Sequence, residues 1–319
     1  MKKKIILVLG DPNSVNSEII FKSWNKLSKS TKKRIYLIAN YNLVLEQFKK
    51  LNYSIACTLV KNIYDKQTSN KLKIININLS FKKPFSISKN ISSKFVKNSL
   101  HLAHKIALDK NVIGLINCAI NKSLLSKRNI GVTEFLAKKC KVQKNSEVML
   151  IYNKSLSVTP ITTHISIKKV SSKISKSLII DKIKKIRLWF KKNFKVEPKF
   201  GILGLNPHNF EMRENSEEVN IIKPAISKLK KSGVRIEGPL VSDTVFINDY
   251  KNYNIIVGMF HDQVLAPFKT LYKFNAINVT LGLKYLRVSP DHGTAVNIIG
   301  KNKANPLSLI KCINFVSKF

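Results

Sequence analysis

Short apolar runs alternate with amphipathic stretches along the whole chain, and this alternation constrains the fold more than any other feature of the sequence. Runs that read as strands buried on both faces are Ile5–Leu9, Ile35–Ala39, Ile74–Leu79, Ile113–Ala119, Val148–Tyr152, Phe200–Leu205 and Ile255–Phe260. Apolar residues recur at helical spacing near residues 17–27, 42–51, 91–109, 133–140, 172–194, 217–232 and 306–317. The pattern predicts an α/β protein with mostly parallel sheets and flanking helices.

The length of 319 residues suits roughly two domains of about 150 residues each. No apolar stretch approaches the ~18 residues that a membrane span needs. Lys2–Lys4 and the run Ile5–Leu9 resemble the start of a signal peptide, but the run is shorter than the ~7–15 residues required and Asp11-Pro12 ends it. The basic stretch 172–194 could lie on a membrane surface, although a core-facing helix coated with lysines explains it as well and is preferred. We therefore expect a cytoplasmic protein with no membrane partner.

The net charge of +39 could indicate nucleic-acid binding. The lysines, however, are scattered along the whole chain, and only six arginines occur. Reading of bases and planar recognition of phosphate favour the arginine fork over lysine. We interpret the charge as compositional and expect no specific nucleic-acid partner, with a non-catalytic basic binding protein on the same fold kept as an alternative.

Several common sites are disfavoured by the sequence. The turn after the first predicted strand contains no G-x-G-x-x-G, and the chain has neither G-x-x-x-x-G-K-[ST] nor G-x-S-x-G. A Rossmann-type cofactor site, a P-loop ATPase and an α/β-hydrolase are therefore not expected. Four cysteines form no C-x-x-C pair, which predicts buried free thiols rather than disulfides or a zinc ribbon.

Histidines with distinctive neighbours are the strongest candidates for chemistry. His164, His208, His261 and His292 follow or lie within apolar, strand-like segments. His101 and His104 lie inside a predicted helix and are expected to be surface or packing residues. Ligands of α/β sheets bind at the carboxyl ends of strands, so histidines placed there are expected to converge. Each one alone could be a hydrogen-bonded loop residue, but as a set they indicate a shared site for a divalent metal ion.

A second group of residues follows His261. Lys269, Asn278 and Arg287 supply an ammonium, an amide and a guanidinium at offsets of 8, 17 and 26 residues. Such groups beside a metal suit a ligand that carries phosphate and carboxylate. Arg287 is the most informative of the three, because arginine is scarce in this chain and this one lies between apolar residues.

The motifs, taken in order, resemble those of the 4-hydroxythreonine-4-phosphate dehydrogenases of pyridoxal phosphate biosynthesis. The resemblance covers nearly the whole chain, and the part from residue 204 to residue 295 is the most specific. The segments that carry it are GDPNSVNSEI (10–19), NCAINK (117–122), GVTEFLA (131–137), TTH (162–164), GLNPH (204–208), GPLVSDTVF (238–246), FHDQVLAPFK (260–269), NVTLGL (278–283) and RVSPDHGTA (287–295).

The resemblance implies two α/β domains like those of the isocitrate and isopropylmalate dehydrogenases. Residues 1–125 with about 290–319 would form one domain, and about 126–289 the other. It also implies a homodimer, with a shared active site in the interdomain cleft.

Carried over by motif, the resemblance assigns roles to individual residues. His164, His208 and His261 would bind one divalent metal ion (Zn, Mg or Co) with ligands drawn from both subunits, and with Lys269 they would be the catalytic residues. The substrate would contact Thr133, Lys269, Asn278 and Arg287, and Asp243 and Asp262 would orient the metal-binding imidazoles. The cofactor, NAD or NADP, would bind at His292, Gly293, Thr294 and Ala295 together with GKNKANP (300–306).

The implied reaction is oxidation of 4-phosphohydroxy-L-threonine at its 3-hydroxyl. The β-keto acid formed loses CO₂ and leaves 3-amino-2-oxopropyl phosphate. The chain departs from the family pattern in several places. Val132 stands where a substrate-contacting histidine is usual, Ala119 where proline is common, and Ser14 and Asn16 at glycine-rich positions of the first motif. The span from Lys122 to Gly131 is also shorter than usual. Val132 keeps open an alternative substrate, a phosphorylated hydroxy acid such as a phosphothreonate or phosphoerythronate.

Overall fold

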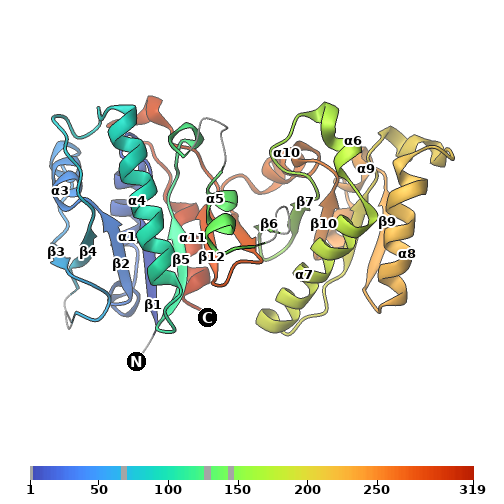
Figure 1. The fold of residues 1–319 in the computed structure, drawn as a ribbon, viewed down its shortest axis with the longest axis horizontal. Helices are drawn as coiled ribbons and strands as arrows, with labels where there is room; N and C mark the ends of the chain where they lie inside the picture. The colour runs from blue at the N-terminus through green and yellow to red at the C-terminus, as the bar shows by residue number, and fades with distance from the viewer. Residues whose placement is uncertain (1–2, 66–69, 126–130, 143–146) are drawn as a thin grey trace. The chain divides into compact units, whose positions relative to one another are not determined.

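The computed structural model describes residues 3–65, 70–125, 131–142 and 147–319, and the predicted α/β class is confirmed (Figure 1). The chain divides into two compact units. One consists of Met1–Lys141 with Leu283–Phe319, and the other of Val142–Gly282. Each unit has its own run of adjacent strands and its own covering helices.

The sheet of the first unit has the strand order β3-β4-β2-β1-β5-β12, and its described pairings are parallel. Every residue of β2 is buried, as expected for a central strand covered on both faces. The strands are β1 (Lys4–Val8), β2 (Ile35–Ala39), β3 (Cys57–Val60), β4 (Leu72–Asn76), β5 (Val112–Asn117) and β12 (Arg287–Pro290).

Helices cover both faces of this sheet (Figure 1). Helix α4 packs on β1, β2 and β5 from one face, whereas α1, α3 and α11 gather on the other. The Asn40 side chain caps α3 by accepting the N–H of Leu43 at 2.9 Å. The helices and 3₁₀ turns are α1 (Asn16–Asn25), α2 (Lys29–Lys32), α3 (Tyr41–Lys50), α4 (Lys89–Ala107), η1 (Lys122–Leu124), α5 (Val132–Lys139), η6 (Val296–Ile298) and α11 (Leu307–Val316).

The sheet of the second unit has the order β11-β6-β7-β10-β8-β9. The pairs β11–β6 and β6–β7 are antiparallel, and β7, β10, β8 and β9 run parallel. The strands are β6 (Val148–Tyr152), β7 (Ser157–Pro160), β8 (Phe200–Leu203), β9 (Ile236–Leu240), β10 (Ile255–Gly258) and β11 (Ile277–Leu281). The helical elements are η2 (Ile167–Lys169), α6 (Val170–Lys173), α7 (Lys176–Phe194), η3 (Pro207–Met212), η4 (Glu218–Ile222), α8 (Lys223–Lys231), α9 (Ser242–Val245), η5 (Asp249–Asn252) and α10 (His261–Tyr272).

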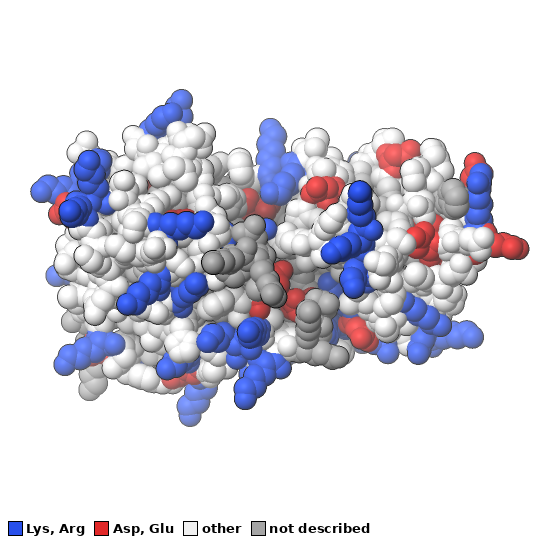
Figure 2. All heavy atoms as spheres, turned by 45° about the horizontal axis from the view of Figure 1, so that its top comes forward, with Lys and Arg blue, Asp and Glu red and all other residues white. Residues whose placement is uncertain are grey.

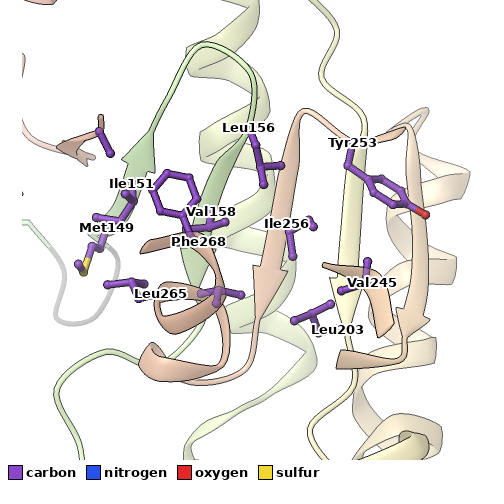
Figure 3. Packing of buried hydrophobic residues seen from close by; sticks show 12 residues of the cluster. Met149, Ile151, Leu156, Val158, Leu203, Val245, Tyr253, Ile256, Leu265 and Phe268 are labelled. Atoms are coloured by element: carbon purple, nitrogen blue, oxygen red, sulfur yellow. The ribbon is translucent and has the colours of Figure 1, made fainter. Parts of the chain in front are cut away.

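One hydrophobic cluster joins α10 to the sheet of this unit (Figure 3). Phe268 of α10 is fully buried and lies among Ile151 of β6 and Val158 of β7. Burial of a side chain of this size stabilises the fold by roughly 1.5–3 kcal/mol. The cluster therefore holds the start of α10, which carries His261, firmly against the carboxyl ends of β7 and β10.

The structure corrects some boundaries. The predicted helix 172–194 is two helices, because the chain is extended at Ile174 and Ser175 caps α7 by accepting the N–H of Leu178. Its core-facing orientation is confirmed, since Ile179, Ile183 and Ile186 are buried. Among the described residues no helix combines the length and apolarity needed to cross a bilayer.

The short strands β3, β7, β9, β11 and β12 were not among the predicted strands. The free thiols are confirmed, but Cys57 is only half-buried, whereas the other three cysteines are buried. Lysine and arginine side chains are spread over the face shown in Figure 2, with acidic side chains between them. That spread agrees with the compositional interpretation of the charge.

Candidate active site

The candidate metal ligands follow parallel neighbouring strands of the second unit. His164 comes shortly after β7, His208 after β8 and His261 after β10. Because β7, β10 and β8 are adjacent and parallel, their carboxyl ends lie at one edge of the sheet. The topology therefore brings the three loops to the same edge.

Two of the three imidazoles lie close together. The ring centroids of His164 and His261 are 5.5 Å apart, with an interplanar angle of 41°. The Nδ1 atom of His261 is 2.7 Å from Oδ1 of Asp262. A carboxylate that orients one ring nitrogen and leaves the other for an ion is the usual support of a metal-binding histidine. The donor set of this pair fits a divalent first-row ion.

His208 is not part of this pair. It lies in η3 with a left-handed φ of 48°, and Asn209 beside it has a φ of 55°. Its Nε2 is 3.9 Å from Oδ2 of Asp243, and both side chains are largely exposed. Among the residues that the structure describes, no group of three or more His, Cys, Asp or Glu side chains is arranged to hold a metal ion. Within one chain the structure thus brings together two of the predicted ligands.

A buried carboxylate holds the loop that leads to His208. Glu218 is fully buried, and its Oε1 accepts the backbone N–H groups of Leu205 and Asn206 at 2.7 and 2.9 Å. The Asn206 side chain donates to Oε2 of Glu218 at 3.0 Å. Glu218 was not among the predicted site residues, because no sequence pattern specifies the backbone N–H groups that its carboxylate accepts. Its partner Asn206 belongs to the motif GLNPH (204–208), and this was the one sequence feature that pointed to the loop.

Lys269 and Asn278 lie in the same unit as the histidines. Lys269 is exposed on α10, about 12 Å along the helix axis from His261 at 1.5 Å per residue. Asn278 is half-buried on β11, and its Oδ1 atom is buried without a hydrogen-bond partner among the described residues. A buried acceptor of this kind is costly unless a ligand or water satisfies it.

Arg287 and Thr133 meet in the first unit. Arg287 is buried at the start of β12, where its Nε donates to Oδ1 of Asn117 at 2.8 Å and its Nη1 donates to Oγ1 of Thr133 at 3.2 Å. Burial lowers the pKa of the Arg287 guanidinium to about 10, so it keeps its charge at neutral pH. Asn117 and Thr133 thus orient the guanidinium, and the Glu134 carboxylate interacts with it electrostatically. Val132, where the family resemblance leads one to expect histidine, is half-buried at the start of α5 next to Thr133.

The candidate cofactor segment follows β12. The carbonyl oxygen of Thr294 accepts the N–H of Val15 at 3.1 Å, and Ala295 has a left-handed φ of 45°. The Nδ1 atom of His292 is 2.9 Å from the carbonyl oxygen of Gly293. A Cβ added at Gly293 would have no heavy atom within 4 Å. The Gly293 backbone is therefore accessible to a ligand.

Helix α1 holds the segment 302–304 through the buried Glu18 carboxylate and the partly exposed Lys22 ammonium. Oε1 of Glu18 accepts the N–H of Ala304 at 2.8 Å and lies 2.7 Å from Nζ of Lys22. The Lys22 ammonium also donates to the carbonyl oxygens of Asn302 and Ala304 at 2.9 and 3.1 Å. Neither Glu18 nor Lys22 was a predicted site residue.

Comparisons with known proteins give one consistent result. Residues 27–316 match the family of the pyridoxal phosphate biosynthetic protein PdxA. The 4-hydroxythreonine-4-phosphate dehydrogenase of Sulfurihydrogenibium sp. (strain YO3AOP1) is 39% identical over 316 residues, which are 97% of this chain and 96% of that protein.

Solved structures agree with this match. The crystal structure of 4-hydroxythreonine-4-phosphate dehydrogenase from Klebsiella pneumoniae superposes with a TM-score of 0.83 at 26% identity, covering 100% of this chain and 98% of that one. Isocitrate dehydrogenase from Methylococcus capsulatus, at 8% identity, shares the fold alone, with a TM-score of 0.51 over 98% of this chain and 84% of that one.

Proposed function

The chain belongs to the PdxA family of pyridoxal phosphate biosynthetic proteins, and from this premise we propose that it oxidises 4-phosphohydroxy-L-threonine at the 3-hydroxyl with NAD or NADP. In this reaction the C3–H bond breaks, hydride passes to the nicotinamide and the hydroxyl proton is released. The resulting β-keto acid loses CO₂ to give 3-amino-2-oxopropyl phosphate. Nicotinamide supplies the hydride acceptor, and a divalent ion, when bound, supplies Lewis-acid stabilisation of the negative charge on oxygen.

His164 and His261 would hold that ion. The pair is supported by the 5.5 Å separation of the two rings and by the Asp262 carboxylate at Nδ1 of His261. We propose His208 as a further ligand, supplied within a homodimer by the other subunit, and Asp243 as the group that orients its ring. Zn, Mg and Co all remain candidates, because histidine sites accept several ions and availability decides among them.

Arg287, Thr133, Asn278 and Lys269 would bind the substrate. The buried guanidinium of Arg287, held by Asn117, suits a carboxylate or phosphate. The buried acceptor of Asn278 suits an O–H or N–H donor of the substrate. The Lys269 ammonium would supply a cation for an anionic group. Orientation by these side chains would place C3 for hydride transfer.

The segment from His292 to Ala295, with residues 300–306, would bind the dinucleotide. The accessible backbone at Gly293 and the fixed position of Ala304 support this assignment. We also propose that the protein acts in the cytoplasm.

The observation that carries the proposal is the match at 39% identity over 97% of the chain, with the histidine pair at one sheet edge as its structural support. The test is a steady-state assay of purified protein with 4-phosphohydroxy-L-threonine, a divalent ion, and either NAD or NADP. Formation of reduced nicotinamide with release of CO₂ supports it. Turnover only of a phosphothreonate or phosphoerythronate, which lack the amine, would favour the alternative that Val132 keeps open.

A further inference from the structure

The Gln263 carboxamide joins three loops at the carboxyl edge of the second unit's sheet. Its Oε1 accepts the N–H of Met259 at 2.7 Å. Its Nε2 donates to the carbonyl oxygen of Gly204 at 2.7 Å and to Oγ of Ser242 at 2.8 Å. Both amide hydrogens and the amide oxygen are therefore used, each toward a different segment of the chain.

A fourth loop is hydrogen-bonded to the same residue, Met259. The carbonyl oxygen of Met259 accepts the N–H of Thr162 at 3.0 Å and its hydroxyl at 2.7 Å. The polar chain thus runs from Gly204 and Ser242 through Gln263 and Met259 to Thr162. Thr162 is buried, and Gln263 is partly buried.

Each residue in this hydrogen-bonded chain lies near, in sequence, a residue of the candidate metal site. Thr162 is two residues before His164, Met259 is two before His261, and Gly204 is four before His208. Ser242 is adjacent to Asp243. Gln263 thus forms hydrogen bonds to the loops that follow β8, β9 and β10.

Close packing leaves this arrangement little freedom. A Cβ added at Gly258 would lie 2.9 Å from Oε1 of Gln263 and 2.5 Å from a methyl group of Val264. A Cβ added at Gly204 would lie 2.0 Å from Oδ1 of Asn209. The backbone of both loops therefore approaches its neighbours as closely as glycine allows, and small displacements of Gln263 are passed on to the loops.

We propose that Gln263 is a positioning residue of the metal site. Its carboxamide fixes the loops that carry His164 and His261 and, through Gly204, the loop whose His208 would serve the metal site of the other subunit. The inference rests on the proposed function, because it assumes that these histidines bind a metal ion. Gln263 itself does not touch the ion or the substrate. It acts by holding His164 and His261 where they can share one ion, and His208 where it can reach the ion of the other subunit, as outer hydrogen-bonding partners do in metal sites.

Substitution of Gln263 by methionine or by glutamate removes different subsets of its three hydrogen bonds. Gln263→Met keeps the length of the side chain but removes all three hydrogen bonds. Gln263→Glu still accepts from the Met259 N–H. It reverses the bond to Ser242, whose hydroxyl would donate to the carboxylate, and it cannot donate to the Gly204 carbonyl. Ser242→Ala removes a single bond and leaves Gln263 in place.

The experiment is titration of the full-length protein with Co²⁺, followed by its visible absorption spectrum and by competition with Zn²⁺. Gln263→Met is expected to weaken metal affinity by about 10- to 100-fold and to change the Co²⁺ spectrum, while circular dichroism stays that of the wild type. Gln263→Glu is expected to fall between Gln263→Met and wild type. Ser242→Ala should weaken binding by roughly two- to tenfold.

Gln47 provides a matched control in the first unit. It is buried, and its Nε2 donates to the carbonyl oxygens of Pro12 and Pro84 at 2.8 and 2.6 Å. Gln47→Met removes a comparable set of bonds away from the histidines and should leave Co²⁺ affinity and spectrum unchanged.

Wild-type metal affinity and an unchanged Co²⁺ spectrum in folded Gln263→Met would overturn this inference alone. If Gln263→Met does not fold, unchanged binding in Ser242→Ala would do so. Absence of Co²⁺ and Zn²⁺ binding by the wild type would overturn the metal part of the proposed function, and the inference with it.

Discussion

The imidazole rings of His164 and His261, which are 97 residues apart in the sequence, lie with their centroids 5.5 Å apart at the edge of one sheet. Adjacent parallel strands β7 and β10 bring them there. If this pair holds the metal ion, His261→Ala should lower metal affinity and kcat by at least about 100-fold, more than loss of an outer partner costs. Metal analysis of the purified variant and steady-state kinetics check the result.

His101→Ala is the matched control for that substitution. His101 is an exposed histidine on α4 of the other unit, so its loss should leave metal content and kcat unchanged. Wild-type metal content in folded His261→Ala would show that the ion binds elsewhere.

Arg287→Met is expected to raise the KM for the phosphorylated substrate and to lower kcat/KM by roughly 10- to 100-fold, because a hydrogen-bonded charge is lost. Asn117 and Thr133 would also lose their donor. Arg287→Lys should rescue only partly, since an ammonium cannot reproduce the planar fork. Substrate titration at saturating cofactor measures both variants, and full rescue by lysine would mean that the charge alone matters.

Glu18→Gln is expected to raise the KM for the nicotinamide cofactor by roughly tenfold with little change in kcat. The buried carboxylate holds both Lys22 and the N–H of Ala304, so the neutral amide should loosen the segment 302–304. Glu46→Gln, on the exposed side of α3, is the control and should bind cofactor normally. Equal cofactor KM values in Glu18→Gln and Glu46→Gln would show that the segment 302–304 does not take part in binding the dinucleotide.

Lys73 gives the stability of the protein a dependence on alkaline pH. Its side chain is fully buried on β4, with Nζ 5.1 Å from the ring centroid of Tyr36, and burial lowers its pKa from 10.5 to about 8. Between these values the unfolded chain binds more protons than the folded protein. The free energy of unfolding should therefore gain a contribution from this residue as pH rises from about 8 to 10.5, and lose it as pH falls.

Lys73→Met should accordingly stabilise the protein at pH 7 by on the order of 1–3 kcal/mol and remove this part of the pH dependence. Thermal unfolding across the alkaline range tests it. Lys71→Met, on a neighbouring exposed residue, should change neither quantity. A lower melting temperature for Lys73→Met at pH 7 would mean that the ammonium is better compensated than its surroundings indicate.

The buried strands that consist of continuous apolar residues could be predicted from sequence, because such runs stand out from the amphipathic stretches between them. Ile35–Ala39 is buried at every position, and this run was predicted as a strand with the same bounds. Strands β9 and β12 escaped prediction because Gly238-Pro239 interrupts one and Arg287 and Ser289 enter the other. Their extended conformation comes from pairing with β8 and β5, which is tertiary information.

In the candidate site, too, some features could be predicted from local sequence and others depend on tertiary contacts. Histidines at strand ends stand out from sequence because of their neighbours and because the strands themselves are predictable. The resemblance led us to expect that Arg287 and Thr133 both contact the substrate. The hydrogen bond between them, across 154 residues of sequence, is seen only in the structure. The roles of Gln263 and Glu218 depend on backbone donors and acceptors that no sequence pattern specifies.

The most direct test of the account is turnover by the metal-loaded protein, measured as reduced nicotinamide and CO₂ formed from 4-phosphohydroxy-L-threonine with NAD or NADP. We predict equal amounts of the two products, loss of both on chelation of the metal, and their return when Zn, Mg or Co is restored. Turnover that persists undiminished in His164→Ala, or no reduced nicotinamide from this substrate with any of the three ions, would contradict it.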